Sequence, residues 1–86
     1  MTGEQLVRSY KEWSEPIFAD GALSRKEKEL IAMAVAIAVA GRGCVDEHRG
    51  YAIDLGATEA EVVEAIGVVM SIMACGAVAA HTDLFH

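Results

Sequence analysis

Apolar residues recur along the first part of the chain at the spacing of a helix. Between residues 2 and 19 they fall at three- and four-residue intervals, at Leu6, Val7, Tyr10, Trp13 and Ile17. Pro16 lies inside this pattern, and because proline cannot donate the backbone hydrogen bond of a helix interior, the helix is expected to kink or restart there. Its apolar stripe is expected to pack on the central helices or on a neighbouring subunit.

A serine and a glutamate three residues apart, Ser24 and Glu27, form a capping box that predicts the start of a second helix. This helix is expected to run to about Ala40. The Gly-Arg-Gly run at 41–43 is expected to end it, because glycine is the usual residue just past a helix. From Leu30 onward the helix is apolar on all sides, which predicts burial on all sides.

Two more helices are predicted downstream. The first covers residues 44–55 and is ended by Gly56. A second capping box, Thr58 and Glu61, then opens a longer helix over about 59–81. No alternating apolar and polar run with a hairpin turn occurs, so no strand is expected. The sequence therefore predicts one all-α domain over residues 1–86, with about four helices.

Composition and charge limit the classes of partner that the chain is expected to bind. Apolar residues make up 53% of the 86, which is more than so short a chain can readily hide, so a second copy is expected to cover part of the surface. The net charge is −6 and no long basic run occurs, which argues against nucleic-acid binding and against an anionic membrane surface.

The chain is not expected to span or enter a membrane. Its two longest apolar runs, Leu30 to Ala40 and Ile66 to Ala80, have 11 and 15 residues, whereas a spanning helix needs about 20. Residues 1–15 carry several charges and do not resemble a secretory signal. We therefore expect a cytoplasmic protein. The two cysteines lie 31 positions apart and match no zinc-binding spacing, so neither a metal nor another cofactor is expected.

Three polar residues around the apolar helix are the candidates for chemistry. Cys44 follows the glycine break at the expected start of a helix, where unpaired amides favour a thiolate. His48 lies four residues later on the same helix face and can stabilise the thiolate or accept its proton. Glu29 begins the apolar run, and a helical hairpin would fold it back toward Cys44 as a proton-relay carboxylate.

Each candidate also has a purely structural interpretation. Cys44 would be a small hydrophobe, His48 a surface residue and Glu29 a solvated residue of the first helical turn. Cys75 is most simply a core residue, with a resolving thiol as the alternative. The end of the chain is interpreted as a polar tail rather than a metal site, although it holds His81, Asp83 and His86.

These motifs resemble the core of the carboxymuconolactone decarboxylase family, which includes the AhpD-like alkylhydroperoxidases. The family pattern has a glutamate in a KEL-type helix start, a C-x-x-C-x-x-x-H motif about twelve residues later, and a GAT-x-x-E step. In this chain the KEL-type start corresponds to residues 28–30, and the GAT-x-x-E step corresponds to residues 56–61. The resemblance covers residues 24 to about 80.

The register of the resemblance assigns the site residues. His48 falls on the family histidine, Cys44 on the second motif cysteine, and Gly41 on the position of the first. In AhpD-like members the second cysteine attacks, the first resolves it as a disulfide, and the glutamate and histidine relay protons. The resemblance thus implies Cys44 as the attacking thiol and His48 with Glu29 as the relay. It also implies an all-α AhpD-like helical bundle, assembled as a trimer or hexamer.

Three functions follow from these observations. The favoured one is an AhpD-like, thiol-dependent peroxide reductase; because its neighbouring resolving cysteine is missing, a sulfenic acid on Cys44 would need an external thiol, or Cys75, to return to the thiol. The second is a decarboxylase-like acid–base enzyme acting on a small organic acid, with His48 as base and Glu29 as its support. The third is a non-catalytic oligomeric module.

Overall fold

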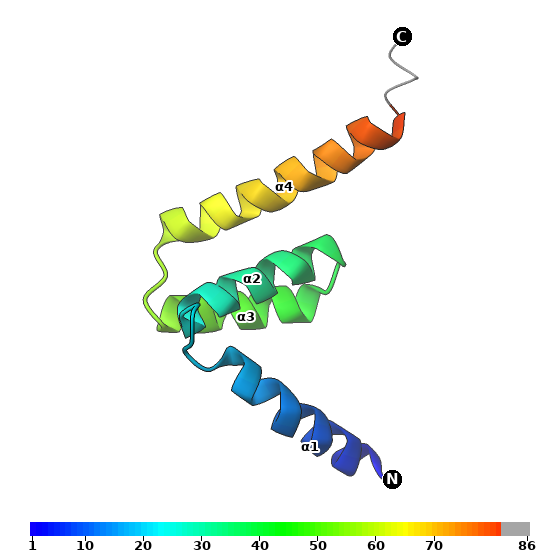
Figure 1. Cartoon of the computed structure of the whole chain (residues 1–86), viewed down its shortest axis with the longest axis vertical. Coiled ribbons are helices and arrows are strands. Elements are labelled where there is room, and N and C mark those ends of the chain that lie inside the picture. Colours follow the sequence, from blue (N-terminus) through cyan, green and yellow to red (C-terminus); the bar gives the residue numbers. More distant parts are fainter. Residues whose placement is uncertain (82–86) are drawn as a thin grey trace.

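The computed structural model describes residues 1–81, and every regular element among them is helical (Figure 1). In chain order the elements are α1 (Gly3–Ser14), the short 3-10 helix η1 (Glu15–Phe18), α2 (Arg25–Ala38), α3 (Arg42–Asp54) and α4 (Glu59–His81). The all-α prediction is confirmed, and each predicted helical stretch corresponds to one α-helix, although α3 begins two residues earlier than predicted, within the Gly-Arg-Gly run.

Both ends of α1 follow from the local sequence. The Thr2 hydroxyl accepts a hydrogen bond from the Gln5 amide at 3.1 Å, and the Gln5 side chain accepts one from the Thr2 amide at 2.8 Å. This reciprocal pair satisfies two amides that the first helical turn leaves free. At the other end, the α-helix stops at Ser14 and Pro16 lies in the first turn of η1. The break predicted at Pro16 is confirmed.

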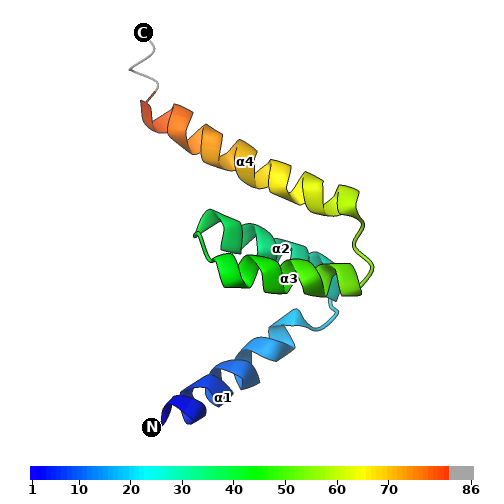
Figure 2. The ribbon, with the colours of Figure 1, turned by 180° about the vertical axis from the view of Figure 1, so that it is seen from behind.

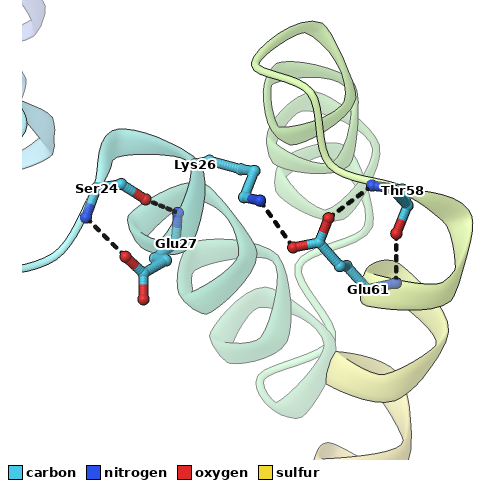
Figure 3. Close-up of polar contacts among 5 residues, drawn as sticks. All are labelled: Ser24, Lys26, Glu27, Thr58 and Glu61. Atoms are coloured by element: carbon cyan, nitrogen blue, oxygen red, sulfur yellow. Dashed lines mark hydrogen bonds and ion pairs between the residues drawn. The ribbon is translucent and has the colours of Figure 1, made fainter.

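Capping boxes start α2 and α4, and an ion pair joins them (Figure 3). In the α2 box, the Ser24 hydroxyl accepts from the Glu27 amide at 3.1 Å and the Glu27 carboxylate from the Ser24 amide at 2.9 Å. Thr58 and Glu61 repeat the arrangement at the same two distances. Lys26 Nζ lies 2.8 Å from Glu61 Oε2, so the pair ties the first turn of α2 to the first turn of α4.

The turns after α2 and α3 use the same hydrogen-bond pattern with different residues. After α2, the Gly41 amide donates to the Ala36 carbonyl at 2.8 Å, and Ala40 adopts a left-handed conformation with φ 59°. After α3, the Ala57 amide donates to the Ala52 carbonyl at 2.9 Å around Gly56, whose φ is 97°. Gly56 ends α3 as predicted. The prediction for α2 was wrong in detail, because Ala40 rather than a glycine takes the left-handed position.

The core lies where α4 crosses the hairpin of α2 and α3. The most extensive packing is between α2 and α3, and α2 also packs against α4 (Figure 1). The buried apolar side chains are few and mostly small: Met33, Ala36, Ala52, Ala57, Val62 and Val69. Small side chains allow the helix axes to approach closely, so this core is compact but thin.

The expectation that α2 is buried on all sides is wrong for the single chain. Ile31, Val35 and Val39 recur every four residues on one face of α2, and they are 50%, 57% and 70% exposed. The reason is geometrical. Helices α3 and α4 cover only part of the circumference of α2, and no other element of the chain packs on the rest to a comparable extent.

Helices α1 and α4 extend from opposite sides of the hairpin (Figures 1 and 2). Helix α1 continues directly into η1, and neither has a buried residue, so the stripe of five apolar residues predicted over them is exposed. The central helices of the same chain therefore do not cover this stripe. No helix within residues 1–81 has the length and hydropathy needed to cross a lipid bilayer.

Candidate functional site

The site begins with a buried carboxylate. Glu29, on α2, is 2% exposed and is the only charged residue in the buried class among the residues whose side chains are described. Removing a carboxylate from water costs several kcal/mol unless a partner compensates it. The alternative prediction, that Glu29 is a solvated residue of the first helical turn, is wrong. The buried carboxylate needs a partner within the fold.

The partner is His48, on α3. Its Nδ1 lies 2.5 Å from Glu29 Oε2, although the residues are nineteen positions apart in sequence. The hairpin of α2 and α3 brings them together, as predicted for Glu29, although its direct contact is with the imidazole and not with Cys44. Since a carboxylate oxygen accepts, Nδ1 carries the proton in this bond and Nε2 remains free for another partner.

Two aromatic rings hold the imidazole of His48. The Phe18 ring, from η1, stacks on it with centroids 5.7 Å apart and planes 11° apart. The Tyr51 ring, one turn further along α3, meets it edge-on with centroids 5.7 Å apart and planes 80° apart. The imidazole is thus held at one nitrogen, on one face and at one edge, which leaves it few orientations.

Cys44 lies on the first turn of α3, one turn before His48. Its thiol is free and exposed, and the N-cap residue Gly41 offers no side chain to the first amides of the helix. Among the described residues, no hydrogen bond joins Cys44 to His48 or to Glu29. The structure therefore brings two of the three predicted residues into direct contact and places the third nearby.

All three residues line one cavity of about 460 Å³. Its α3 wall is a single helix face, formed by residues at positions 44, 47, 48 and 51. The opposite wall comes from α1 and η1, and the start of α2 contributes at one end. The lining residues are Tyr10, Lys11, Ser14, Glu15, Phe18, Arg25, Glu29, Cys44, Glu47, His48 and Tyr51. A small substrate in this cavity would meet both the thiol and the imidazole.

Gly41 has room for the cysteine that the family pattern places there. A Cβ at this position would lie 3.8 Å from Cys44 Cβ and at ordinary contact distance, 3.6 Å, from the Ala36 carbonyl oxygen. The backbone φ of Gly41 is −85°, which any residue adopts. Position 41 therefore has room for a side chain directed toward Cys44, but it carries no sulfur.

Of the other predicted candidates, the structure describes Cys75 and places it outside the site. Cys75, on α4, is exposed, so its prediction as a core residue is wrong, and it does not line the cavity. Asp83 and His86 lie outside the described residues. Within residues 1–81, no group of three metal-ligating side chains of the His, Cys, Asp and Glu types comes together.

Sequence reasoning missed two aromatic residues of the site. Tyr51 follows His48 by three residues, so helix periodicity was a sufficient signal for it. Its hydroxyl donates to Glu47 Oε1 at 3.0 Å, and this bond to a carboxylate raises the pKa of Tyr51. Phe18 had no such signal, because its place against His48 depends on how η1 folds back onto the hairpin.

Two known proteins are similar to this chain over nearly its whole length. A protein of Paracoccus denitrificans described as "uncharacterized protein 4 in cox locus" is 37% identical over 81 residues, which cover 94% of this chain and 72% of that protein. A crystal structure of a protein from Methanobacterium thermoautotrophicum, a structural genomics target, superposes with a TM-score of 0.81 at 32% identity, over 95% of this chain and 94% of the other.

The family itself is given by a sequence model that matches nearly the whole chain. The model of the carboxymuconolactone decarboxylase family matches residues 4–84, a range that includes the Glu29–His48 pair, Cys44 and, apart from Gly3, all four α-helices. The resemblance seen in the KEL start and the GAT step is thereby confirmed, and the chain belongs to the carboxymuconolactone decarboxylase family.

Proposed function

We propose that the chain is a thiol-dependent peroxide reductase of the AhpD-like type, with Cys44 as the attacking thiol and His48 and Glu29 as its proton relay. One observation carries the proposal. Glu29, the only buried charged residue among those whose side chains the structure describes, is bonded to His48 inside the cavity that Cys44 lines. A buried carboxylate–imidazole pair facing a free thiol is suited to removing and returning a proton.

The proposed reaction starts with proton transfer from Cys44 to Nε2 of His48. Glu29, at Nδ1, stabilises the resulting imidazolium ion. The thiolate then attacks one peroxide oxygen, the O–O bond breaks, and the departing alkoxide takes the proton back from Nε2. The products are an alcohol and a sulfenic acid on Cys44, with sulfur oxidised and the peroxide reduced.

An external thiol completes the proposed cycle. It condenses with the sulfenic acid, releasing water and forming a mixed disulfide on Cys44. A second thiol then attacks this disulfide, so that Cys44 returns to its thiol form and the two external thiols leave as a disulfide. Position 41 carries glycine and Cys75 does not line the cavity, which supports an external rather than an internal resolving thiol. A reducing cytoplasm would supply such thiols.

Mass spectrometry of Cys44 tests the proposal. After brief peroxide treatment with a sulfenic-acid trapping reagent, we expect the trapped adduct on Cys44 and not on the exposed Cys75. Glu29→Gln keeps the size of the side chain but not its charge, so it is expected to slow adduct formation by about 10²–10⁴-fold. Glu64→Gln, exposed on α4 and away from the cavity, is the control and is expected to react nearly as fast as the wild type. Equal labelling of both cysteines, or full activity in Glu29→Gln, would contradict the proposal.

A second function is favoured by a different observation. The Glu29–His48 pair is complete without Cys44, to which neither residue is hydrogen-bonded. Such a pair can act alone as an acid–base catalyst on a small organic acid, as a decarboxylase-like member would. Cys44→Ser separates the two functions. It abolishes peroxide reduction, whereas an acid–base activity would survive it and would be lost in His48→Ala.

We also propose that the chain works as a homo-oligomer, a trimer or hexamer. The exposed apolar stripe of α1 and the exposed face of α2 support this, because both lack a partner within the chain. The reaction needs a small-molecule peroxide and a thiol reductant, and no nucleic acid or membrane.

A further inference from the structure

A lysine next to the site holds the segment that carries Phe18. Lys28 Nζ donates to the backbone carbonyl of Ile17 at 2.9 Å and to that of Ala19 at 2.5 Å. A Cβ built on Gly21 would lie 3.7 Å from the same nitrogen, so the loop after η1 curls around it. An ammonium group has three donors and suits a set of converging carbonyls, especially at the C-terminal end of a helical turn.

The two bonds flank the residue that contacts the imidazole. Ile17 and Ala19 are the immediate neighbours of Phe18, whose ring stacks on His48 with planes 11° apart. Fixing the carbonyls on both sides of a residue fixes the direction in which its side chain leaves the backbone. Lys28 therefore sets where the Phe18 ring lies.

Helix α2 thus holds the imidazole by two routes from adjacent residues. Glu29 bonds Nδ1 directly, while Lys28 acts through Phe18 on the ring face. The imidazole can turn only about its Cα–Cβ and Cβ–Cγ bonds, and the hydrogen bond at Nδ1 and the stacked Phe18 ring both limit this turning. Rotation matters because it would move Nε2 relative to the thiol.

We propose that Lys28 is a positioning residue for His48 that acts through Phe18, an inference that rests on the proposed function for its catalytic consequence. Lys28 also fixes η1 to α2, and η1 follows α1 directly in the chain. The lysine consequently places the α1 wall of the cavity, including Tyr10 and Ser14, as well as the ring on His48.

Substitution of Lys28, with a matched control, tests the inference. Lys28→Met removes the donors and keeps most of the stem, and Lys28→Arg keeps donors. Lys26→Met removes the same charge from the same helical turn, where Lys26 pairs with Glu61 and not with η1. The ring protons of His48 are observed by NMR, because a stacked aromatic ring displaces their chemical shifts. The pH profile of Cys44 oxidation by peroxide is measured alongside.

We expect Lys28→Met to move the His48 ring signals toward those of a free imidazole, and Lys28→Arg and Lys26→Met to leave them near the wild-type positions. Oxidation of Cys44 should slow by about tenfold to a hundredfold in Lys28→Met, the usual effect of a small misplacement of a reacting group, with an altered pH profile. Phe18→Leu should reproduce both changes, as the link through which Lys28 acts. Lys28→Gln, which shortens the side chain and removes its charge, should move the ring signals in the same direction as Lys28→Met and keeps the test valid if Lys28→Met does not fold.

Unchanged ring signals in folded Lys28→Met, or in Phe18→Leu, would overturn the inference, as would equal effects of Lys28→Met and Lys26→Met. The NMR measurement needs no turnover. If the wild-type chain fails to reduce peroxide, the proposed function is refuted, while the position of His48 is still tested by its ring signals.

Discussion

At the scale of single residues, the first prediction concerns position 41, where the family pattern has a cysteine and this chain has a glycine. A cysteine at position 41 would place its Cβ 3.8 Å from Cys44 Cβ, which is close to the mean separation in disulfides. The position has ordinary backbone angles and room for the side chain, so little strain is expected. We predict that Gly41→Cys forms an internal disulfide with Cys44 after one round of peroxide oxidation, and thereby becomes independent of a monothiol for resolution.

Intact-mass analysis with thiol counting checks this prediction. The variant should lose the free thiols at positions 41 and 44 together, and no trapped sulfenic acid should accumulate. Gly50→Cys is the control, because it lies on the same helix with open space around it, and it should keep its added thiol free. If Gly41→Cys instead accumulates sulfenic acid on Cys44, as the wild type is expected to, then a thiol at position 41 does not reach Cys44 and the prediction is wrong.

The residues of the site differ in how far sequence could predict them. Spacing placed Cys44 and His48 on one face of a helix, and a hairpin placed Glu29 within their reach. Sequence could not tell which of the two Glu29 would contact, because the contact depends on the rotation of α2 and α3 about their axes. Phe18 and Lys28 were beyond prediction for a related reason, since the fold of a proline-containing 3-10 turn onto a helix leaves no periodic pattern.

At the scale of elements, the two left-handed turn residues give a matched pair of predictions. Ala40 and Gly56 occupy equivalent positions after α2 and α3, with φ of 59° and 97°. A left-handed conformation costs a residue with a Cβ roughly 1–2 kcal/mol, of which the greater unfolded-state entropy of glycine offsets roughly 0.5–1 kcal/mol. Ala40→Gly should therefore raise the free energy of unfolding by about 0.5–1 kcal/mol, and Gly56→Ala should lower it by a similar amount.

Chemical denaturation at a fixed protein concentration measures both changes. Nothing lies within 4 Å of a Cβ built on Gly56, so the effect of Gly56→Ala would come from the backbone alone. Gly50→Ala, in the middle of α3 and equally open, is the control and should stabilise the chain, because alanine is the better helix former. Stabilisation by Gly56→Ala would contradict the turn geometry.

The link between the starts of α2 and α4 predicts a response to acid. The pKa of Glu61 is lowered from 4.5, first by its bond with Lys26 and then by the Thr58 amide, and the pKa of Glu27 is lowered chiefly by the Ser24 amide. A carboxyl group whose pKa is lower in the folded state stabilises the fold fully above its unfolded pKa, and this contribution is lost as pH falls through the folded pKa. Stability should therefore decline below pH 4.5.

Thermal unfolding followed by circular dichroism across this range checks the acid response. Glu61→Gln should have a lower melting temperature than the wild type near neutral pH, and the difference should shrink in acid, where the wild-type carboxylate is protonated as well. Glu64→Gln, three residues later on α4, is the control. A difference that stays constant from neutral to acidic pH would show that charge at position 61 does not support the fold.

The helices and their boundaries were the most predictable part of the structure, because the residues that determine them are close together in sequence. Two capping boxes and a proline marked three of the boundaries, and the structure has them where expected. The prediction that α2 is buried on all sides was wrong for a physical reason. Hydrophobic pattern reports which surfaces avoid water, and it does not report whether the same chain or another copy covers them.

At the scale of the whole molecule, the chain is too open for its length. Its radius of gyration is 16.2 Å, whereas a compact chain of this length has about 12 Å. Its accessible surface is 6460 Å², whereas a folded monomer of 9.1 kDa exposes about 4,900 Å². The excess of about 1,600 Å² equals two standard interface halves of about 800 Å² each, which suits a chain with two neighbours in a closed ring.

The last prediction concerns the apolar stripe on α1, because a substitution there can test assembly without changing a residue that lines the cavity. Trp13 is 62% exposed on this stripe and does not line the cavity, whereas Tyr10 does. A buried interface tryptophan is worth about 2 kcal/mol or more, which is about 30-fold in affinity, and a charge in its place adds a desolvation cost. Trp13→Glu should therefore shift the chain toward the 9.1 kDa monomer in light scattering, whereas Glu12→Gln, beside the stripe, should not. A wild-type monomer at micromolar concentration, or a Trp13→Glu oligomer of unchanged mass, would mean that the apolar surface of α1 serves a partner other than a second copy.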